Sequence, residues 1–141
     1  GLIRHGNSEF KNGNFSEAEV NYRKSLDKEY SPKAQFNLGD ALYEQKNYED
    51  AQKNFSEVAE RNVSKEIESD AYYNLGNTYM AQEKYAEAFD SYKKSSSSSS
   101  KLLISKSLGL NSIPLPALDS SALLGSRSID IGSSISSISS L

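Results

Sequence analysis

One pattern of seventeen residues occurs three times in this chain, and it limits the fold more than any other feature. The copies read GNSEFKNGNFSEAEVNY from Gly6, GDALYEQKNYEDAQKNF from Gly39 and GNTYMAQEKYAEAFDSY from Gly76. Their first residues lie 33 and then 37 residues apart. Internal repeats of this period are typical of stacked supersecondary units, in which neighbouring copies bury a core that one copy cannot bury alone.

The positions that the three copies share have a helical spacing. In each copy an aromatic residue, an alanine and a second aromatic residue follow the glycine at intervals of nine, three and four. Intervals of three and four are the period of a helix. Small residues allow two helices to cross closely, and the rings fill the space between them. Each copy therefore predicts two packed helices. The shared positions are Phe15, Ala18 and Tyr22, then Tyr48, Ala51 and Phe55, then Tyr85, Ala88 and Tyr92.

This pattern resembles the tetratricopeptide repeat (TPR) family, whose repeat carries small, aromatic, alanine and aromatic positions in this order. The resemblance covers residues 1 to about 95, with helix pairs at about 1–30, 31–64 and 65–95. It implies an all-α solenoid of antiparallel helix pairs that forms a right-handed superhelix. The second interval is four residues longer around NVSKEIES, which lengthens either a helix end or a loop. EAEVNYRKSL and AYYNLGNTYMAQEKYAEA also resemble, more weakly, the TPR proteins of bacterial aerotolerance (Bat-type) operons, which are linked with membrane or periplasmic complexes.

The composition of the chain changes sharply near residue 95. The last 47 residues contain 19 serines and no aromatic residue, whereas all 14 aromatic residues lie at or before Tyr92. One interpretation of residues 96–141 is a serine-rich low-complexity tail. The other is a provisional sequence, with small side chains written where the true residues were not known. Under the second interpretation the repeats continue, and further helices are expected there.

Composition excludes several classes of function. The chain has no cysteine, which removes disulfides, thiolate metal sites and cysteine nucleophiles. A single histidine, His5, predicts no metal site, and no cofactor is expected. The net charge of −3 opposes nucleic-acid binding. No apolar run approaches the ~18 residues that cross a bilayer, so direct membrane insertion is not expected. No targeting segment is visible in a chain that does not begin with Met, which leaves cytoplasm and periplasm both open.

The TPR resemblance implies a concave groove lined by the first helix of each pair. Asparagine both donates and accepts hydrogen bonds, so it can hold the backbone of an extended peptide, and aromatic side chains can anchor apolar groups. An alternative for Asn37 and Asn74 is to brace neighbouring repeats, and an alternative for Phe36, Tyr43 and Tyr73 is core packing. The candidate partner-binding residues are Asn7, Lys11, Asn37, Asp40, Tyr43, Asn74 and Asn77.

The carboxylate clamp of chaperone-binding TPR domains is not expected here. Its asparagine positions match Asn7 and Asn37, but its cation positions hold Ile3, Asp70 and Asn74. A carboxylate needs cations for tight capture, and Asp70 would repel it.

Three functions remain, and none makes this chain itself an enzyme, because no catalytic constellation is present: a scaffold, a structural subunit, and a regulatory piece of a larger enzyme or secretion machine with the tail as a linker. The first is a scaffold or adaptor that binds a peptide or partner protein in the groove. The alternative is a structural subunit that self-associates or stacks end to end within a larger, membrane-associated complex, through apolar surface around Phe89 and Tyr92.

Overall fold

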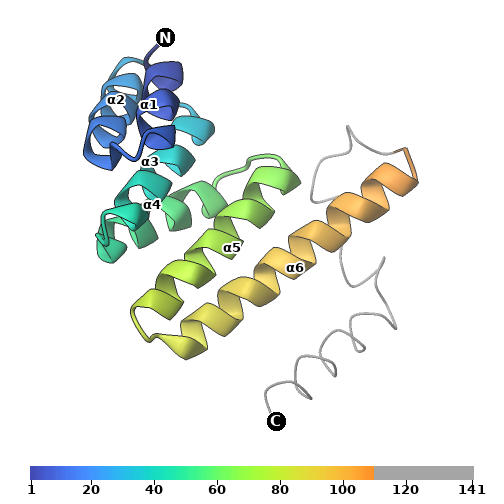
Figure 1. The fold of residues 1–141 in the computed structure, drawn as a ribbon. Coiled ribbons are helices and arrows are strands. Elements are labelled where there is room, and N and C mark those ends of the chain that lie inside the picture. The colour runs from blue at the N-terminus through green and yellow to red at the C-terminus, as the bar shows by residue number, and fades with distance from the viewer. Residues whose placement is uncertain (110–141) are drawn as a thin grey trace. The chain divides into compact units, whose positions relative to one another are not determined.

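The computed structural model describes residues 1–109, which form six α-helices and no strand (Figure 1). The all-α solenoid of helix pairs predicted from the repeats is confirmed. The helices are α1 (Leu2–Lys11), α2 (Phe15–Lys28), α3 (Pro32–Glu44), α4 (Tyr48–Glu60), α5 (Lys65–Ala81) and α6 (Tyr85–Ser107).

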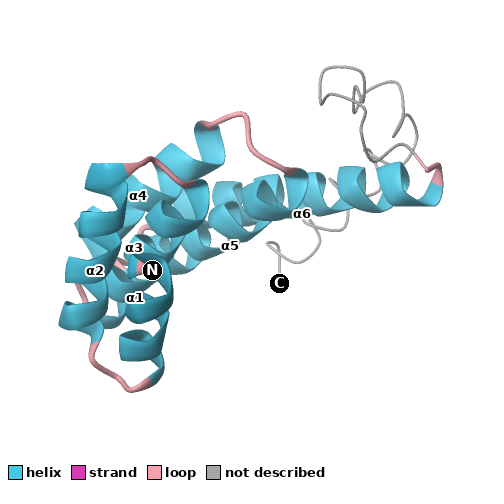
Figure 2. Cartoon of the chain, turned by 90° about the horizontal axis from the view of Figure 1, so that it is seen from above, coloured by secondary structure: helices cyan, strands magenta, loops and turns pink. Residues whose placement is uncertain are grey.

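From α1 to α5, each helix packs against the next one along the chain, and short loops join them (Figure 2). The first helices of successive pairs also contact each other, α1 with α3 and α3 with α5. Helices α1 to α5 and the part of α6 up to Ser99 lie in one compact unit, Gly1–Ser99, and α6 continues into a second unit that begins at Ser100. The predicted boundary between residues 95 and 96 falls within α6, and residues 110–141 of the predicted tail lie outside the described part.

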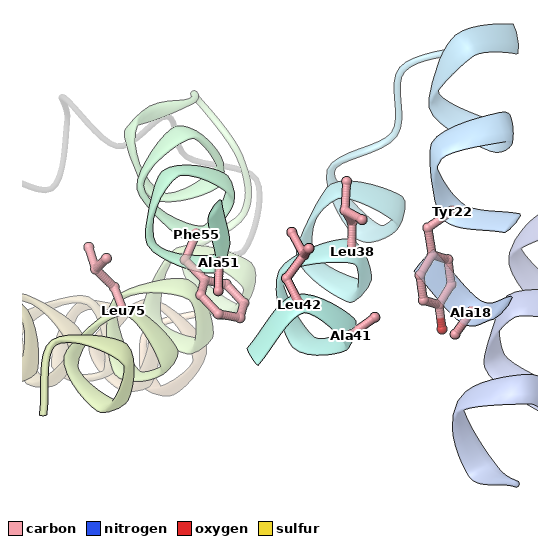
Figure 3. Packing of buried hydrophobic residues seen from close by; sticks show 8 residues of the cluster. All are labelled: Ala18, Tyr22, Leu38, Ala41, Leu42, Ala51, Phe55 and Leu75. Atoms are coloured by element: carbon pink, nitrogen blue, oxygen red, sulfur yellow. The ribbon is translucent and has the colours of Figure 1, made fainter. Parts of the chain in front are cut away.

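The core is centred on α3. Figure 3 shows Leu38 and Leu42 of this helix between Tyr22 of α2 and Phe55 of α4. Tyr22, Leu42 and Phe55 are each 1% exposed. Burying a large apolar side chain contributes about 1.5–3 kcal/mol, so this cluster provides much of the stability of the first two pairs.

The repeated glycines allow the aromatic rings to lie directly on the first helix of each pair. A Cβ added at Gly39 would stand 2.7 Å from Cε1 of Phe55, and the rings of Tyr22 and Tyr92 cover Gly6 and Gly76 in the same way. No larger residue fits unless the ring moves. This contact therefore determines how closely the two helices of a pair approach.

The first helix of each pair ends in the same turn. Gly13, Lys46 and Glu83 stand at equivalent positions with φ of 80°, 63° and 60°, in the left-handed region. After each of them the next amide reaches back five residues, as from Asn14 to the carbonyl of Glu9 at 2.9 Å. This is a Schellman-type closure, and it favours glycine.

The four residues added to the second interval extend a helix and not a loop. α5 has 17 residues where α3 has 13, and the extra turn lies at its N-terminus. Ser64 caps this turn by accepting a hydrogen bond from the amide of Ile67 at 3.3 Å. Ser31 caps α3 in the same way through the amide of Ala34, and Pro32 occupies its first turn.

The third pair is joined by serines as well as by its ring. Ser95 of α6 donates its hydroxyl to the carbonyl of Ser69 at 2.8 Å, and the Ser69 hydroxyl donates to the carbonyl of Ser95 at 3.1 Å. Ser98 donates to Glu68 at 3.0 Å. Ser91, Ser95 and Ser98 are buried, so much of this seam is made of hydroxyl groups where the first two pairs have apolar side chains.

The glycine contact predicts that Gly39→Ala destabilises the chain by about 1–3 kcal/mol, because the added methyl group clashes with Phe55. At a helix position with free space around it, a change from glycine to alanine instead raises the free energy of unfolding by about 1 kcal/mol. Chemical denaturation measures the difference. Combining Gly39→Ala with Phe55→Leu should give a double-mutant cycle with favourable coupling, and additive effects would contradict the proposed clash.

The left-handed turn predicts that Lys46→Gly stabilises the chain by about 0.5–1 kcal/mol, since glycine adopts this backbone without strain. Lys53→Gly, at an exposed position in the middle of α4, is the matched control and should cost about 1 kcal/mol. Thermal unfolding of both variants should show opposite shifts in Tm. A loss of stability in Lys46→Gly as large as in Lys53→Gly would be evidence against strain at the turn.

Candidate functional site

The face formed by α1, α3 and α5, here called the first-helix face, contains two cavities. The first has a volume of about 270 Å³ and the second of about 410 Å³. Asn37 lines both of them, so they adjoin along α3. The first cavity is lined by Asn7, Phe10, Lys11, Tyr22, Asn37 and Asp40. The second is lined by Lys33, Phe36, Asn37, Ser64, Glu66, Ile67 and Asp70.

Side-chain amides connect the pairs across this face. Nδ2 of Asn37 donates to Oδ1 of Asn7 at 3.1 Å, which joins α3 to α1. One repeat further on, Nδ2 of Asn74 donates to Oδ1 of Asp40 at 3.0 Å, which joins α5 to α3. Equivalent residues take part both times, so we call this set of hydrogen bonds the amide ladder.

In two of the three repeats, a tyrosine hydroxyl bonds to the asparagine that follows the repeated glycine. The hydroxyl of Tyr22 donates to Oδ1 of Asn7, and that of Tyr92 donates to Oδ1 of Asn77, both at 2.6 Å. The second repeat has Phe55 at this ring position and Asp40 at the asparagine position. Asp40 therefore lacks the hydroxyl donor that Asn7 and Asn77 have.

Asp40 is the most perturbed acid of the first-helix face. Burial raises the pKa of its carboxyl group from 3.8 to about 7, and the negative charges of Glu44 and Asp70 act in the same direction. The hydrogen bond from Asn74 opposes part of this rise. Burial also raises the pKa of Tyr22, with a further contribution from Asp40. Near neutral pH, Asp40 is therefore divided between its charged and neutral forms.

The structure brings most of the predicted site residues together. Asn7, Lys11, Asn37 and Asp40 line the first cavity, and Asn74 reaches it through Asp40. Tyr43 lies on α3 and Asn77 on α5, but neither residue lines a cavity.

The structure also bears on the alternative roles considered for several of these residues. Asn37 and Asn74 do brace neighbouring repeats through the amide ladder. Phe36 and Tyr43 pack against the core, whereas Tyr73 is 55% exposed. The partner-binding role of the predicted residues stays a prediction.

Sequence reasoning missed several residues of the two cavities. Ser64, Glu66 and Ile67 line the second cavity; Ser64 is the N-cap of the extended α5, and Glu66 and Ile67 lie in its first turn. Tyr22 was assigned to the core alone, but its side chain also lines the first cavity. The longer repeat interval was the available signal for α5. The longer interval did not show that the added residues form a helical turn whose side chains line the second cavity.

Two family models, both described as tetratricopeptide repeat, match the chain over residues 30–101 and residues 3–51. The chain belongs to the tetratricopeptide repeat family. A search of curated proteins finds no match, so the weaker resemblance to Bat-type proteins stays a prediction.

Membership in the TPR family carries a general functional meaning. TPR repeats are generally protein–protein interaction modules, and the family is generally non-catalytic. Within residues 1–109, no helix combines the length and the hydropathy that a membrane crossing needs. In the same part of the chain, no three His, Asp or Glu side chains gather as a metal site would require.

The raised pKa of Asp40 predicts that folding stability falls as pH increases from about 4 to about 7. In this range the folded chain binds more protons than the unfolded chain, so stability is fully present below the unfolded pKa and is lost as pH passes through the folded pKa. Asp40→Asn keeps an acceptor for Asn74 and carries no charge. It should raise the free energy of unfolding at pH 8 by roughly 1–4 kcal/mol and flatten this dependence on pH.

Urea denaturation between pH 4 and pH 8 measures this effect. Glu29→Gln, an exposed position at the end of α2, removes one negative charge outside the cavities and is the matched control. If both variants changed stability equally at pH 8, general charge repulsion would explain the result and the assignment to Asp40 would be wrong.

Proposed function

We propose that this TPR chain is a non-catalytic scaffold or adaptor whose first-helix face is a groove that binds an extended peptide segment of a partner protein. The observation that carries the proposal is the pair of adjoining cavities that share Asn37. Together they draw on α1, α3 and α5, so a peptide lying along them would contact all three repeats.

The chemistry of the groove supports a peptide as the occupant. Phe10 in the first cavity, and Phe36 with Ile67 in the second, offer apolar contacts for side chains. Asn37 uses one of its groups in the amide ladder, and its carbonyl oxygen receives no hydrogen bond among the described residues. An extended backbone presents amide donors that such an oxygen can accept.

A second function is favoured by exposed rings on α6. Phe89 is 43% exposed and Tyr85 is 60% exposed, although both are large and apolar. Tyr92 is half-buried instead, because its hydroxyl bonds to Asn77 and its ring contacts Tyr73. Self-association or end-to-end stacking would use Tyr85 and Phe89. This function predicts an oligomer whose population depends on concentration in sedimentation experiments, and Phe89→Ser should reduce that population.

The groove hypothesis predicts that blocking the second cavity weakens peptide binding. Lys33 is exposed and lines this cavity, so Lys33→Trp adds bulk where a peptide would lie. Peptides selected from a random displayed library on the 141-residue chain should bind the variant at least about tenfold more weakly, a change of about 1.4 kcal/mol. Fluorescence anisotropy gives the Kd.

Lys53→Trp is the matched control, since it makes the same change at an exposed position of α4 away from both cavities. Its Kd should stay within about twofold of the parent chain. Thermal unfolding of both variants tests whether they are folded. If the selected peptides bind the two variants equally well, or if no peptide is selected at all, the groove hypothesis is wrong.

A further inference from the structure

Asp40 is the one place where the amide ladder departs from its own pattern. Asn7 and Asn77 stand at the equivalent positions of the other repeats, and each accepts a tyrosine hydroxyl. Asp40 accepts only the Asn74 amide, at Oδ1. In residues 1–109 its Oδ2 receives no hydrogen bond, and no lysine or arginine forms an ion pair with it. Asp40 lines the first cavity with one carboxylate oxygen unpaired.

The groups around Asp40 make a negative charge costly there. Glu44 on α3 and Asp70 on α5 add negative potential, and Asn74 of α5 donates its amide. From α2 comes the Tyr22 hydroxyl, which donates to Asn7 and whose pKa is raised by burial and by the charge of Asp40. From α4, Phe55 lies against Gly39, the neighbour of Asp40 in the chain. From α1, Lys11 lines the same cavity without reaching ion-pair distance of Asp40.

An asparagine at position 40 would keep the amide ladder without this cost. Repeats one and three have asparagine at this position, and a neutral acceptor is all that the Asn74 amide requires. Asp40 is partly buried and its Oδ2 faces solvent in the cavity, so among the described residues its negative charge has one hydrogen-bond donor and no neighbouring cation, and it is less stable there than in open water. A bound group that supplies both a positive charge and a hydrogen-bond donor would remove this cost.

We propose that the partner segment carries an arginine or lysine side chain that donates to Oδ2 of Asp40, next to an apolar side chain that lies against Phe36 and Ile67. This inference rests on the proposed function, because it names the chemistry of the segment that the same groove binds. It assigns Asp40 as a specificity-determining residue and the second cavity as the apolar subsite.

The charges of the groove favour a cationic segment over an acidic one. Asp40, Asp70 and Glu66 line the cavities, and Glu44 lies close enough to raise the pKa of Asp40. Among residues 1–109, Lys11 and Lys33 are the cations that line the two cavities. The extra turn of α5 adds Glu66, which makes the lining more negative, and Ile67, which adds an apolar contact beside it. Complementary charge provides specificity and faster association, and the juxtaposition of like charges disfavours acidic partners.

The inference predicts that peptides selected on the 141-residue chain from a random library are enriched in arginine or lysine beside an apolar residue. Replacing that arginine by citrulline, which has nearly the same shape and no charge, should weaken binding at pH 8 by about tenfold or more. Asp40→Asn should remove most of this difference, whereas Glu29→Gln should leave it unchanged. Fluorescence anisotropy measures each Kd.

The dependence on pH gives a second readout that a merely structural role of Asp40 would not produce. A bound cation favours the charged carboxylate, so affinity for the arginine peptide should be highest above pH 7 and fall below it, by up to about tenfold per pH unit. The Asp40→Asn variant should show no such fall, and neither should the citrulline peptide on the parent chain.

The possible outcomes separate this inference from the proposed function. Selected peptides that are acidic or neutral, or arginine peptides that do not distinguish Asp40→Asn from the parent chain, would overturn the inference while the groove hypothesis stands. Peptides that bind Lys33→Trp and Lys53→Trp equally well, or a selection that yields no peptide, would overturn both. Spermidine in competition should displace the peptide only weakly, because it lacks the apolar neighbour.

Discussion

The contact between a glycine and an aromatic ring is the constraint on which the rest of the structure depends. Where Phe55 lies on Gly39, two helices approach closely enough for the small residues Ala41 and Ala51 to be completely buried. Between pairs, α1 contacts α3 and α3 contacts α5 on a common face. The amide ladder spans these contacts between the first helices.

The amide ladder links the stability of the array to its surface chemistry. The residues that join one pair to the next also line the first cavity, so a ligand there would meet side chains that already carry structural hydrogen bonds. Asn37 can serve both purposes because an amide has donors and an acceptor. Asp40 serves the structural purpose less well than asparagine would, and its unpaired oxygen is the feature that distinguishes this groove within its own repeats.

The sequence predicted the fold well because each repeat has small and aromatic residues at the same positions. Gly39, Ala51 and Phe55 follow the helical period, and three copies in step leave little freedom for another architecture. The raised pKa of Asp40 could not be predicted, since it depends on burial and on Asn74 and Asp70, which are distant in sequence and approach Asp40 only in the folded chain. Whether the longer repeat interval lengthens a helix or a loop could not be predicted either, because both can accommodate four additional residues.

The serine seam of the third pair gives the array a polarity along its length. The first two pairs are held by buried apolar side chains such as Leu42 and Phe55, whereas Ser69 and Ser95 exchange hydrogen bonds whose net contribution is small. In a solenoid each repeat is stabilised mainly by its neighbours, so opening begins where the interface is weakest. Among the three described pairs, the seam between α5 and α6 is therefore expected to open before the apolar seams of the first two pairs.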